Sequence, residues 1–353
     1  MIQMYKKMIK KIKHLIAGIF YYSGLLNLIL YFFRKILKKG SFTILTYHRI
    51  SDDNFSDPHI CVSPYNFEKQ LQYLKKRYEI ISLGELVKRI LSENTPSEEY
   101  VAITFDDGYK DIYTNAYPLL NEYKVPATIF LTTGFIGTDK LFWWDRVARI
   151  ITAIISKKLL VELPPDIYPK EVKDLILKIS SGGISNSSEA ITALSVLLKK
   201  ISQTNRDFIL NSLENQILPL LSNNENRPFP LTWEEVRQMS ENGIESGSHT
   251  ITHPILTSVK RDQAEHEILH SKTEIEQKIG KKVMHFCYPN GEKTDFDEQI
   301  IQFVKDNGYI SACSTINGAN YLYGDVFSLK RRDVNNVPIY VFAVKITGIA
   351  DFY

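Results

Sequence analysis

Residues 101–108 (VAITFDDG) carry the feature that most constrains the fold of this chain, an apolar run that ends in two adjacent carboxylates. The β-branched residues of the run predict a buried strand, and the glycine after Asp106 and Asp107 predicts a tight turn. Carboxyl ends of parallel strands converge on ligands at one edge of a barrel or open sheet. Because neighbouring carboxylates repel each other, we expect one to bind a cation and the other to take protons. A solvated Asp-Asp-Gly turn is the alternative.

Strand and helix patterns alternate around this segment. They predict strands over 42–47, 80–83, 101–106 and 126–133, and helices over 65–78, 84–92 and 113–123. Such alternation is typical of parallel βα units. Because the connections between parallel strands are right-handed, the possible topologies reduce to a barrel or a doubly wound sheet. The first strand ends at His48 and Arg49, so a second titratable group is expected at a strand end.

A long helical region interrupts this alternation. Amphipathic pieces over 172–179, 189–201 and 206–221 are separated by polar or proline-containing segments, without a strand pattern between them. We interpret about 146–228 as a helical insertion on the barrel, close to the site. Trp144 precedes it and either lines a sugar-binding cleft with its flat ring or anchors the insertion to the core.

Two histidines follow the next predicted strand. Residues 244–248 are expected to form this strand, which delivers His249, and His253 stands four residues further on. Because the residue before a proline avoids the α region, a turn-like loop is expected here and not a helix. With the second carboxylate of the first segment, these side chains make a His-His-carboxylate set. Such a set suits zinc, or another divalent transition metal, with water in the open positions.

The first 40 residues are basic and apolar. Five lysines precede residues 15–33, a stretch of 19 residues without a charge, and four further basic residues follow it. This length is barely sufficient to span a bilayer, so we expect residues 1–40 to form a helix that spans the membrane, lies in its interface or packs on the globular domain. Membrane association through residues 15–33 predicts a location at the membrane or cell envelope, with the cytoplasm as the alternative.

The composition is that of a folded globular protein, with 44% hydrophobic and 24% charged residues. A net charge of +3 does not favour a nucleic-acid partner. Cys61, Cys287 and Cys313 have no paired spacing, so they predict neither a disulfide framework nor a cysteine-type zinc site.

Two segments resemble the motifs of the polysaccharide deacetylases, the NodB-homology or carbohydrate esterase family 4 group. Residues 104–109 (TFDDGY) match the first motif of that family, and residues 248–254 (SHTITHP) match the second. The resemblance covers roughly residues 44–332, apart from the insertion. It implies an α/β fold, a distorted (β/α)7 barrel. In this chain residues 41–353 would form the barrel with its helical insertion, and residues 1–40 the N-terminal apolar helix.

The resemblance also assigns roles to individual residues. It implies that Asp107, His249 and His253 bind a divalent metal, for which zinc is expected, and that Asp106 is the general base. The implied activity is hydrolysis of N-acetyl groups on a sugar polymer or other glycan, which releases acetate.

Later motifs depart from the family pattern. Residues 287–291 (CYPNG) stand where the family usually has Arg-Pro-Pro-Tyr-Gly, so the arginine that normally holds the base aspartate is missing there. Arg331 and Arg332 are the candidates to orient Asp106 instead. The early Tyr-His strand resembles that of members acting on poly-N-acetylglucosamine, which makes His48 the candidate general acid. A strand-end histidine hydrogen-bonded to its loop is the alternative.

The resemblance places the remaining contacts to substrate and oxyanion. A backbone N–H near Asn290 is expected to stabilise the oxyanion. The other predicted members of this set are Tyr288, Trp144, Arg331 and Arg332. Two other functions stay open at this point: deacetylation of a small or lipid-linked sugar amide, and non-catalytic carbohydrate binding on the same fold.

Overall fold

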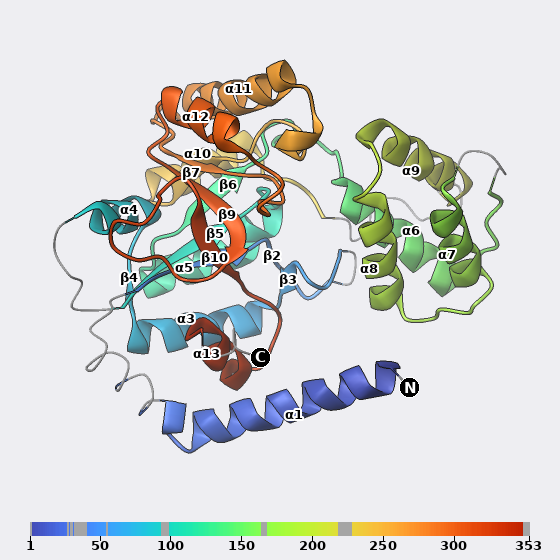
Figure 1. Cartoon of the computed structure of the whole chain (residues 1–353), viewed down its shortest axis with the longest axis horizontal. Helices are drawn as coiled ribbons and strands as arrows, with labels where there is room; N and C mark the ends of the chain where they lie inside the picture. Colours follow the sequence, from blue (N-terminus) through green and yellow to red (C-terminus); the bar gives the residue numbers. More distant parts are fainter. Residues whose placement is uncertain are drawn as a thin grey trace. The chain divides into compact units, whose positions relative to one another are not determined.

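The computed structural model describes residues 2–26, 28, 31, 41–53, 56–92, 99–163, 168–217 and 228–348. The chain divides into two compact units (Figure 1). The first consists of Met1–Ser51, Val62–Thr138 and Pro230–Tyr353, and the second of Asp52–Cys61 and Asp139–Phe229. Each unit contains a hydrophobic core of its own residues.

A closed ring of parallel strands forms the centre of the first unit. Its strands are β1 (Phe42–Tyr47), β5 (Tyr100–Phe105), β6 (Thr128–Leu131), β7 (Glu245–Ser248), β8 (His285–Cys287), β9 (Ser311–Asn317) and β10 (Leu329–Asp333). They pair in the order β1-β10-β9-β8-β7-β6-β5, and β1 also pairs with β5, which closes the ring. The short strand β4 (Glu79–Ile80) adds to the outside of β5, and β2 (Arg49–Ile50) and β3 (Cys61–Val62) lie outside the ring. This topology confirms the predicted α/β fold and distorted (β/α)7 barrel.

Helices follow most of these strands and lie around the barrel (Figure 1). The helices of the first unit are α1 (Ile2–Tyr22), α3 (Pro64–Arg77), α4 (Leu83–Leu91), α5 (Tyr117–Tyr123), α10 (Trp233–Glu241), α11 (Arg261–Ile279), α12 (Glu298–Asp306) and α13 (Ile339–Ile346), with the π-helix η1 (Ile112–Ala116) and the 3-10 helix η3 (Leu256–Ser258). Side-chain caps define several of their starts. Thr232 accepts the N–H of Glu235, whose carboxylate accepts the N–H of Thr232, so α10 begins with a capping box.

The helix predicted over 113–123 is divided into two segments. The π-helix η1 comes first, and the N–H of Tyr117 donates to the carbonyl of Ile112, five residues back. Pro118 follows at once and has no N–H to donate. The hydrogen-bond pattern therefore changes where η1 and α5 meet, and the prediction that residues 113–123 are helical is confirmed.

The strand predicted over 80–83 is shorter than expected. β4 ends at Ile80 because Ser82 accepts the N–H of Glu85 at 3.2 Å, which caps α4 and begins that helix at Leu83. Two residues expected in the strand, Ser82 and Leu83, are thus the N-cap and the first residue of α4.

The apolar stretch 15–33 does not form one helix. α1 ends at Tyr22, Ser23 forms a turn, and Gly24 adopts a φ of 76°. Residues 27, 29, 30 and 32–40 lie outside the described part of the chain. Among the described residues, no helix combines the length and the hydropathy needed to cross a membrane.

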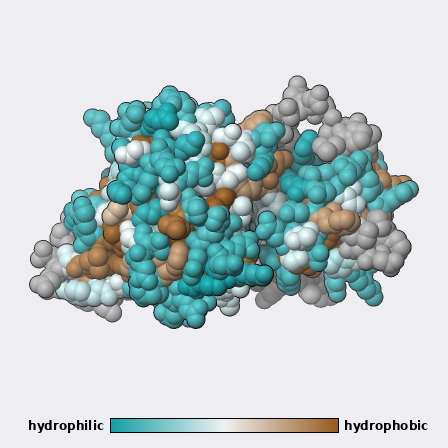
Figure 2. All heavy atoms as spheres, turned by 90° about the horizontal axis from the view of Figure 1, so that it is seen from above, coloured by the Kyte–Doolittle hydropathy of each residue, from teal (hydrophilic) through white to brown (hydrophobic). Residues whose placement is uncertain are grey.

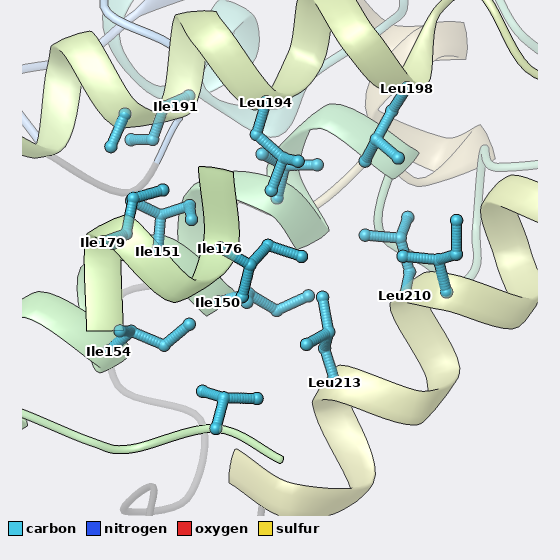
Figure 3. Packing of buried hydrophobic residues seen from close by; sticks show 14 of the residues in the cluster. Ile150, Ile151, Ile154, Ile176, Ile179, Ile191, Leu194, Leu198, Leu210 and Leu213 are labelled. Carbon is cyan, nitrogen blue, oxygen red and sulfur yellow. The ribbon is translucent and has the colours of Figure 1, made fainter. Parts of the chain in front are cut away.

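Helices form most of the described part of the second unit. It contains α6 (Trp143–Lys157), α7 (Lys170–Ser180), α8 (Ser187–Leu198) and α9 (Gln203–Ile217). Isoleucine and leucine side chains from all four helices meet in one core (Figure 3). The segment 52–61 belongs to this unit as well, and Ser56 donates to the carboxylate of Asp145 at 2.5 Å. The interpretation of 146–228 as an insertion did not anticipate this second segment.

Apolar side chains of the first unit gather in a buried core, whereas the face of the molecule seen in Figure 2 is mainly hydrophilic, with small separate hydrophobic groups.

The barrel interior is packed tightly at β7. Gly247 of β7 stands beside the buried Phe130, and a β-carbon at Gly247 would lie 2.4 Å from the Phe130 ring and 3.1 Å from the carbonyl oxygen of His285. The strand therefore has no room for a side chain at this position.

We predict that Gly247→Ala lowers the free energy of unfolding of the barrel by about 1–3 kcal/mol, the usual cost of overpacking a filled core. Thermal unfolding followed by circular dichroism measures the shift. Ser246→Ala on the same strand is the matched control and should leave the midpoint nearly unchanged. Equal midpoints for Gly247→Ala and the wild type would contradict the packing described.

Candidate functional site

Two carboxylates stand at the carboxyl end of β5, where the chain turns away from the barrel. Asp106 and Asp107 are each 2% exposed. Asp107 has a φ of 71° and Gly108 a φ of 84°, in the left-handed region that aspartate tolerates better than most residues and glycine adopts without strain. A β-carbon at Gly108 would also lie 2.7 Å from the side chain of Ile136. This turn directs Asp106 and Asp107 to different partners, although they are adjacent in sequence.

Asp107 faces two histidines that follow β7. Its Oδ1 lies 3.7 Å from Nε2 of His249 and 3.6 Å from Nε2 of His253. The two imidazole rings are 4.7 Å apart and nearly perpendicular. One ligand atom from each of the three residues falls within 4.8 Å of the other two. The structure thus brings the three predicted metal ligands together around one point.

The protonation of the histidines suits metal binding. Nδ1 of His249 lies 2.8 Å from the carbonyl oxygen of Cys287, which only accepts hydrogen bonds, so Nδ1 carries the proton and Nε2 keeps its lone pair. Burial lowers the pKa of His249 to about 4 and also holds the pKa of His253 well below its usual value. Two neutral imidazoles and a carboxylate fit a divalent transition cation such as zinc.

The loop between the two histidines is held by one buried carboxylate. Glu267 on α11, 4% exposed, accepts the backbone N–H groups of Ile251 and Thr252 at 2.7 and 2.8 Å, and the Thr252 hydroxyl at 2.5 Å. Thr250 and His253 in this loop have φ values of 66° and 60°. A β-branched residue in the left-handed region is strained, so the contacts of Glu267 stabilise a backbone conformation that the loop alone would disfavour.

Arg331 holds the first carboxylate, Asp106. Its Nη1 donates to Oδ1 at 2.8 Å and its Nη2 to Oδ2 at 2.7 Å, a two-point contact that fixes the plane of the carboxylate. The guanidinium also donates to the carbonyl oxygen of Ser314 and to the hydroxyl of Thr104. With its side chain 1% exposed, Arg331 is the buried cation of the site.

Arg331 also sets the charge of Asp106. Burial by itself would raise the pKa of this carboxyl, but the positive charge and hydrogen bonds of Arg331 outweigh burial and hold the pKa well below its usual range. Asp106 is therefore ionised at neutral pH and is available as an acceptor.

Cys287 offers a second donor set together with Asp106 and His249. Its Sγ lies 3.1 Å from Nη2 of Arg331, and burial keeps the pKa of the thiol well above its usual value. A protonated thiol beside a guanidinium is a poor metal ligand, because cations bind the thiolate. The set with Asp107 and both histidines is the better candidate.

His48 lies at the end of β1, on the same side of the barrel. Its Nε2 is 4.0 Å from Oδ2 of Asp106, and its side chain is 24% exposed, more than any of the metal-binding candidates. The structure thus places the His48 imidazole beside the Asp106 carboxylate, where the imidazole can contact both a bound substrate and solvent.

Tyr288 and Arg332 have partners within the protein. Tyr288 is fully buried, its hydroxyl donates to the carbonyl of Phe327 and its N–H to the carbonyl of Cys313. Arg332 donates to the side-chain oxygen of Asn317, whereas its neighbour Arg331 donates to Asp106. Of the two arginines proposed to orient Asp106, Arg331 is thus the one that makes the contact, and contacts of Tyr288 and Arg332 with substrate stay predictions.

Asn290 and Trp144 remain predictions. Asn290 adopts a φ of 59° in the turn after β8, and its carbonyl accepts from the hydroxyl of Thr315. Trp144 belongs to the second unit, where its ring stacks on Phe142 at 4.7 Å between centroids.

Sequence reasoning missed Glu267 and the supporting contacts of Arg331. Glu267 stands in an ordinary-looking helix with many charged residues, and no spacing signal distinguishes it from Glu265 or Glu274. Its role depends on which face of α11 packs against the histidine loop.

The comparisons with known proteins concern both the sequence and the fold. The sequence matches the profile of the family described as Polysaccharide deacetylase over residues 93–174 and 193–312. A poly-beta-1,6-N-acetyl-D-glucosamine N-deacetylase from Staphylococcus aureus is 34% identical over 125 residues, covering 32% of this chain and 43% of that protein. The chain spans less than half of the length of the curated relatives that it matches first.

Two solved structures share the fold. A deacetylase from Streptococcus pyogenes in complex with acetate has a TM-score of 0.53 and 19% identity, over 84% of this chain and 93% of that one. IcaB from Ammonifex degensii has a TM-score of 0.54 and 14% identity, over 87% of this chain and 96% of that one.

We predict that Glu267→Ala weakens zinc binding by about tenfold to a hundredfold, as is usual when residues that support metal ligands are lost. The alanine leaves two backbone N–H groups of the histidine loop without their acceptor. Glu267→Gln should retain most of the affinity, because its amide oxygen can accept from the backbone and its NH₂ can donate to Thr252. Calorimetric titration of the metal-free protein with zinc measures both.

Glu265→Ala is the matched control, because it removes a carboxylate from the same helix that pairs only with the partly exposed Arg261. This control should bind zinc as the wild type does. If Glu267→Ala also bound zinc normally, Glu267 would have no part in positioning the histidines.

Proposed function

Because the chain belongs to the polysaccharide deacetylase family, we propose that it hydrolyses the acetamide bond of an N-acetylated glycan, with a divalent cation held by Asp107, His249 and His253. The observation that carries this proposal is the convergence of these three side chains beside the ionised Asp106. Paired ligand and base functions at the carboxyl end of barrel strands are typical of hydrolytic metal sites.

A divalent cation in this set supplies Lewis acidity, which polarises the amide carbonyl and lowers the pKa of water. Asp106 accepts a proton from the attacking water, and the two hydrogen bonds from Arg331 keep its carboxylate in a fixed orientation. Because Arg331 holds the pKa of Asp106 low, the carboxylate is ionised and free to accept this proton. Another group must protonate the departing nitrogen.

His48 is the proposed donor of that proton. It lies 4.0 Å from Asp106 and is partly exposed, so it stands beside the proposed base and can exchange protons with solvent. As the C–N bond breaks, the nitrogen takes a proton from His48 and the water oxygen remains in acetate. Transfer of the proton from Asp106 to His48 restores both groups.

The substrate class is argued from chemistry and from similarity. The relative from Staphylococcus aureus is named for a polymer of N-acetyl-D-glucosamine, which supports an N-acetylated hexosamine as the substrate unit. In this proposal the backbone near Asn290 helps to bind the oxyanion.

We predict that Asp106→Asn retains metal and loses about 10²–10⁴-fold in turnover, the usual contribution of a general base. Metal content after dialysis and acetate release from an N-acetylglucosamine oligomer measure the two effects. Asp306→Asn at the end of α12 is the control for loss of a carboxylate. A near-normal rate for Asp106→Asn would show that another group is the base.

A second variant separates metal binding from proton transfer. His253→Ala removes one ligand, so we expect loss of both metal and activity, and added zinc should restore only a small part of the rate. Asp106→Asn and His253→Ala therefore differ in metal content although both are inactive. Full activity of the protein after removal of all metal would refute the proposed function.

The substrate class is tested with a panel of N-acetylated glycans of different length, after incubation with zinc, manganese or cobalt. Acetate release from an N-acetylated hexosamine oligomer is the expected result. Tight glycan binding without acetate release, and without dependence on metal, would instead show a binding protein.

A further inference from the structure

The N-terminal helix α1 packs on the barrel unit through one face only. Ala17 is 7% exposed, and the side chain of Tyr340 on α13 lies 4.0 Å from where a β-carbon at Gly18 would be. The His14 ring meets Tyr340 edge-on at 6.2 Å, and Tyr21 lies 6.2 Å from Tyr73 on α3. In Figure 1, α1 lies alongside α13 and α3. The orientation of the helix is therefore set by contacts with α13 and α3.

The opposite face of α1 carries an apolar stripe. Its members recur at intervals of four and three residues, the spacing that keeps side chains on one side of a helix. They are Met8, Ile12, Leu15 and Ile19, with exposed fractions of 50%, 48%, 65% and 56%. Tyr22, 74% exposed, borders this row and contacts Tyr340 of α13 at 6.1 Å between ring centroids. Four large apolar side chains in one exposed row are unusual on a soluble surface and mark an interaction site.

The charged side chains of this segment of the sequence are all of one sign. Lys6, Lys7, Lys10, Lys11 and Lys13 lie in the same segment, and no aspartate or glutamate stands before Asp52 in the sequence. Lys11 and Lys13 are exposed. The surface that covers the stripe must therefore accept apolar side chains next to a dense positive charge.

We propose that α1 lies in the plane of an anionic lipid bilayer, with the stripe in the boundary between headgroups and acyl chains and the lysines on the headgroups. Apolar burial and lysine attraction to anionic lipid add to each other in this arrangement. A second copy of the chain is disfavoured as the occupant, because it would bring two basic segments together. The proposal stands independently of the proposed deacetylase activity.

This proposal revises the expectation for residues 15–33. The contact with lipid is made by the outer face of residues 8–19, which begins earlier and includes the lysine-rich turns. Because α1 packs on α13 and α3, it would hold the barrel unit at the surface of the membrane.

The test uses the full chain and extruded vesicles of phosphatidylcholine, with or without phosphatidylglycerol, in a co-sedimentation assay. We expect binding to the vesicles with phosphatidylglycerol, weaker binding as salt is raised, and little binding to phosphatidylcholine alone. Ile19→Asp should weaken binding by about tenfold to a hundredfold, since it removes one buried apolar side chain. Lys11→Glu combined with Lys13→Glu should reduce the preference for anionic lipid.

Leu160→Asp is the matched control, because Leu160 is an apolar residue, 84% exposed, in the second unit. It should bind vesicles as the wild type does. Acetate release by Ile19→Asp from a soluble oligomer reports whether the barrel is folded, and Leu15→Asp serves as a second variant if Ile19→Asp is unstable. Equal vesicle binding by Ile19→Asp and wild type, or no preference for phosphatidylglycerol, would overturn the proposal. So would a wild-type dimer that Ile19→Asp converts to a monomer without any effect of lipid.

Discussion

The buried contact between Arg331 and Asp106 connects the strands on which the rest of the site depends. β10 supplies the guanidinium and β5 the carboxylate, and β1 lies between the two strands in the ring. Each charge is removed from water, so each needs the other, and loss of one partner of such a pair typically costs about 3–5 kcal/mol. The same contact orients the carboxylate beside the metal ligands. Stability of the barrel and geometry of the site are thus served by one interaction.

Backbone strain is concentrated at the strand ends that carry the site. Asp107, Thr250, His253 and Asn290 all have positive φ values, and they lie in turns after β5, β7 and β8. Such conformations persist only where the surroundings determine them, and Glu267 does so for the histidine loop. The protein's own contacts therefore fix the loop that carries the histidine ligands, which reduces the ordering that cation binding would otherwise require.

Much of the barrel could be predicted from the pattern of apolar residues. β1 was found with its observed bounds, and β5 and β6 within two residues, because each is a buried run with β-branched residues that ends at a polar turn. β7 (ESGS) was also found within two residues, although it contains no β-branched residue. β8 has three residues, which are too few to show the alternating pattern from which a strand is predicted. β10 (LKRRD) has a polar sequence, because the side chain that enters the barrel there is a paired arginine and not an apolar residue.

The candidate site was predictable where a short motif contains it. Asp106, Asp107, His249 and His253 stand in two segments whose spacing indicates metal chemistry. Their supporting residues lie far away in sequence, and the choice between Arg331 and Arg332 depends on which face of β10 meets the barrel interior. Sequence alone could name both arginines but not choose between them.

Cys287 and Arg331 together describe how this site differs from the family pattern. The cysteine stands where the motif usually has an arginine, and the guanidinium that reaches Asp106 comes from another strand and lies against the cysteine sulfur. A chain with arginines at both positions would place two cations side by side in a dry interior, and one with neither would leave Asp106 uncompensated. The effect of a substitution at either position therefore depends on the residue at the other, because together the two positions set the charge that faces Asp106.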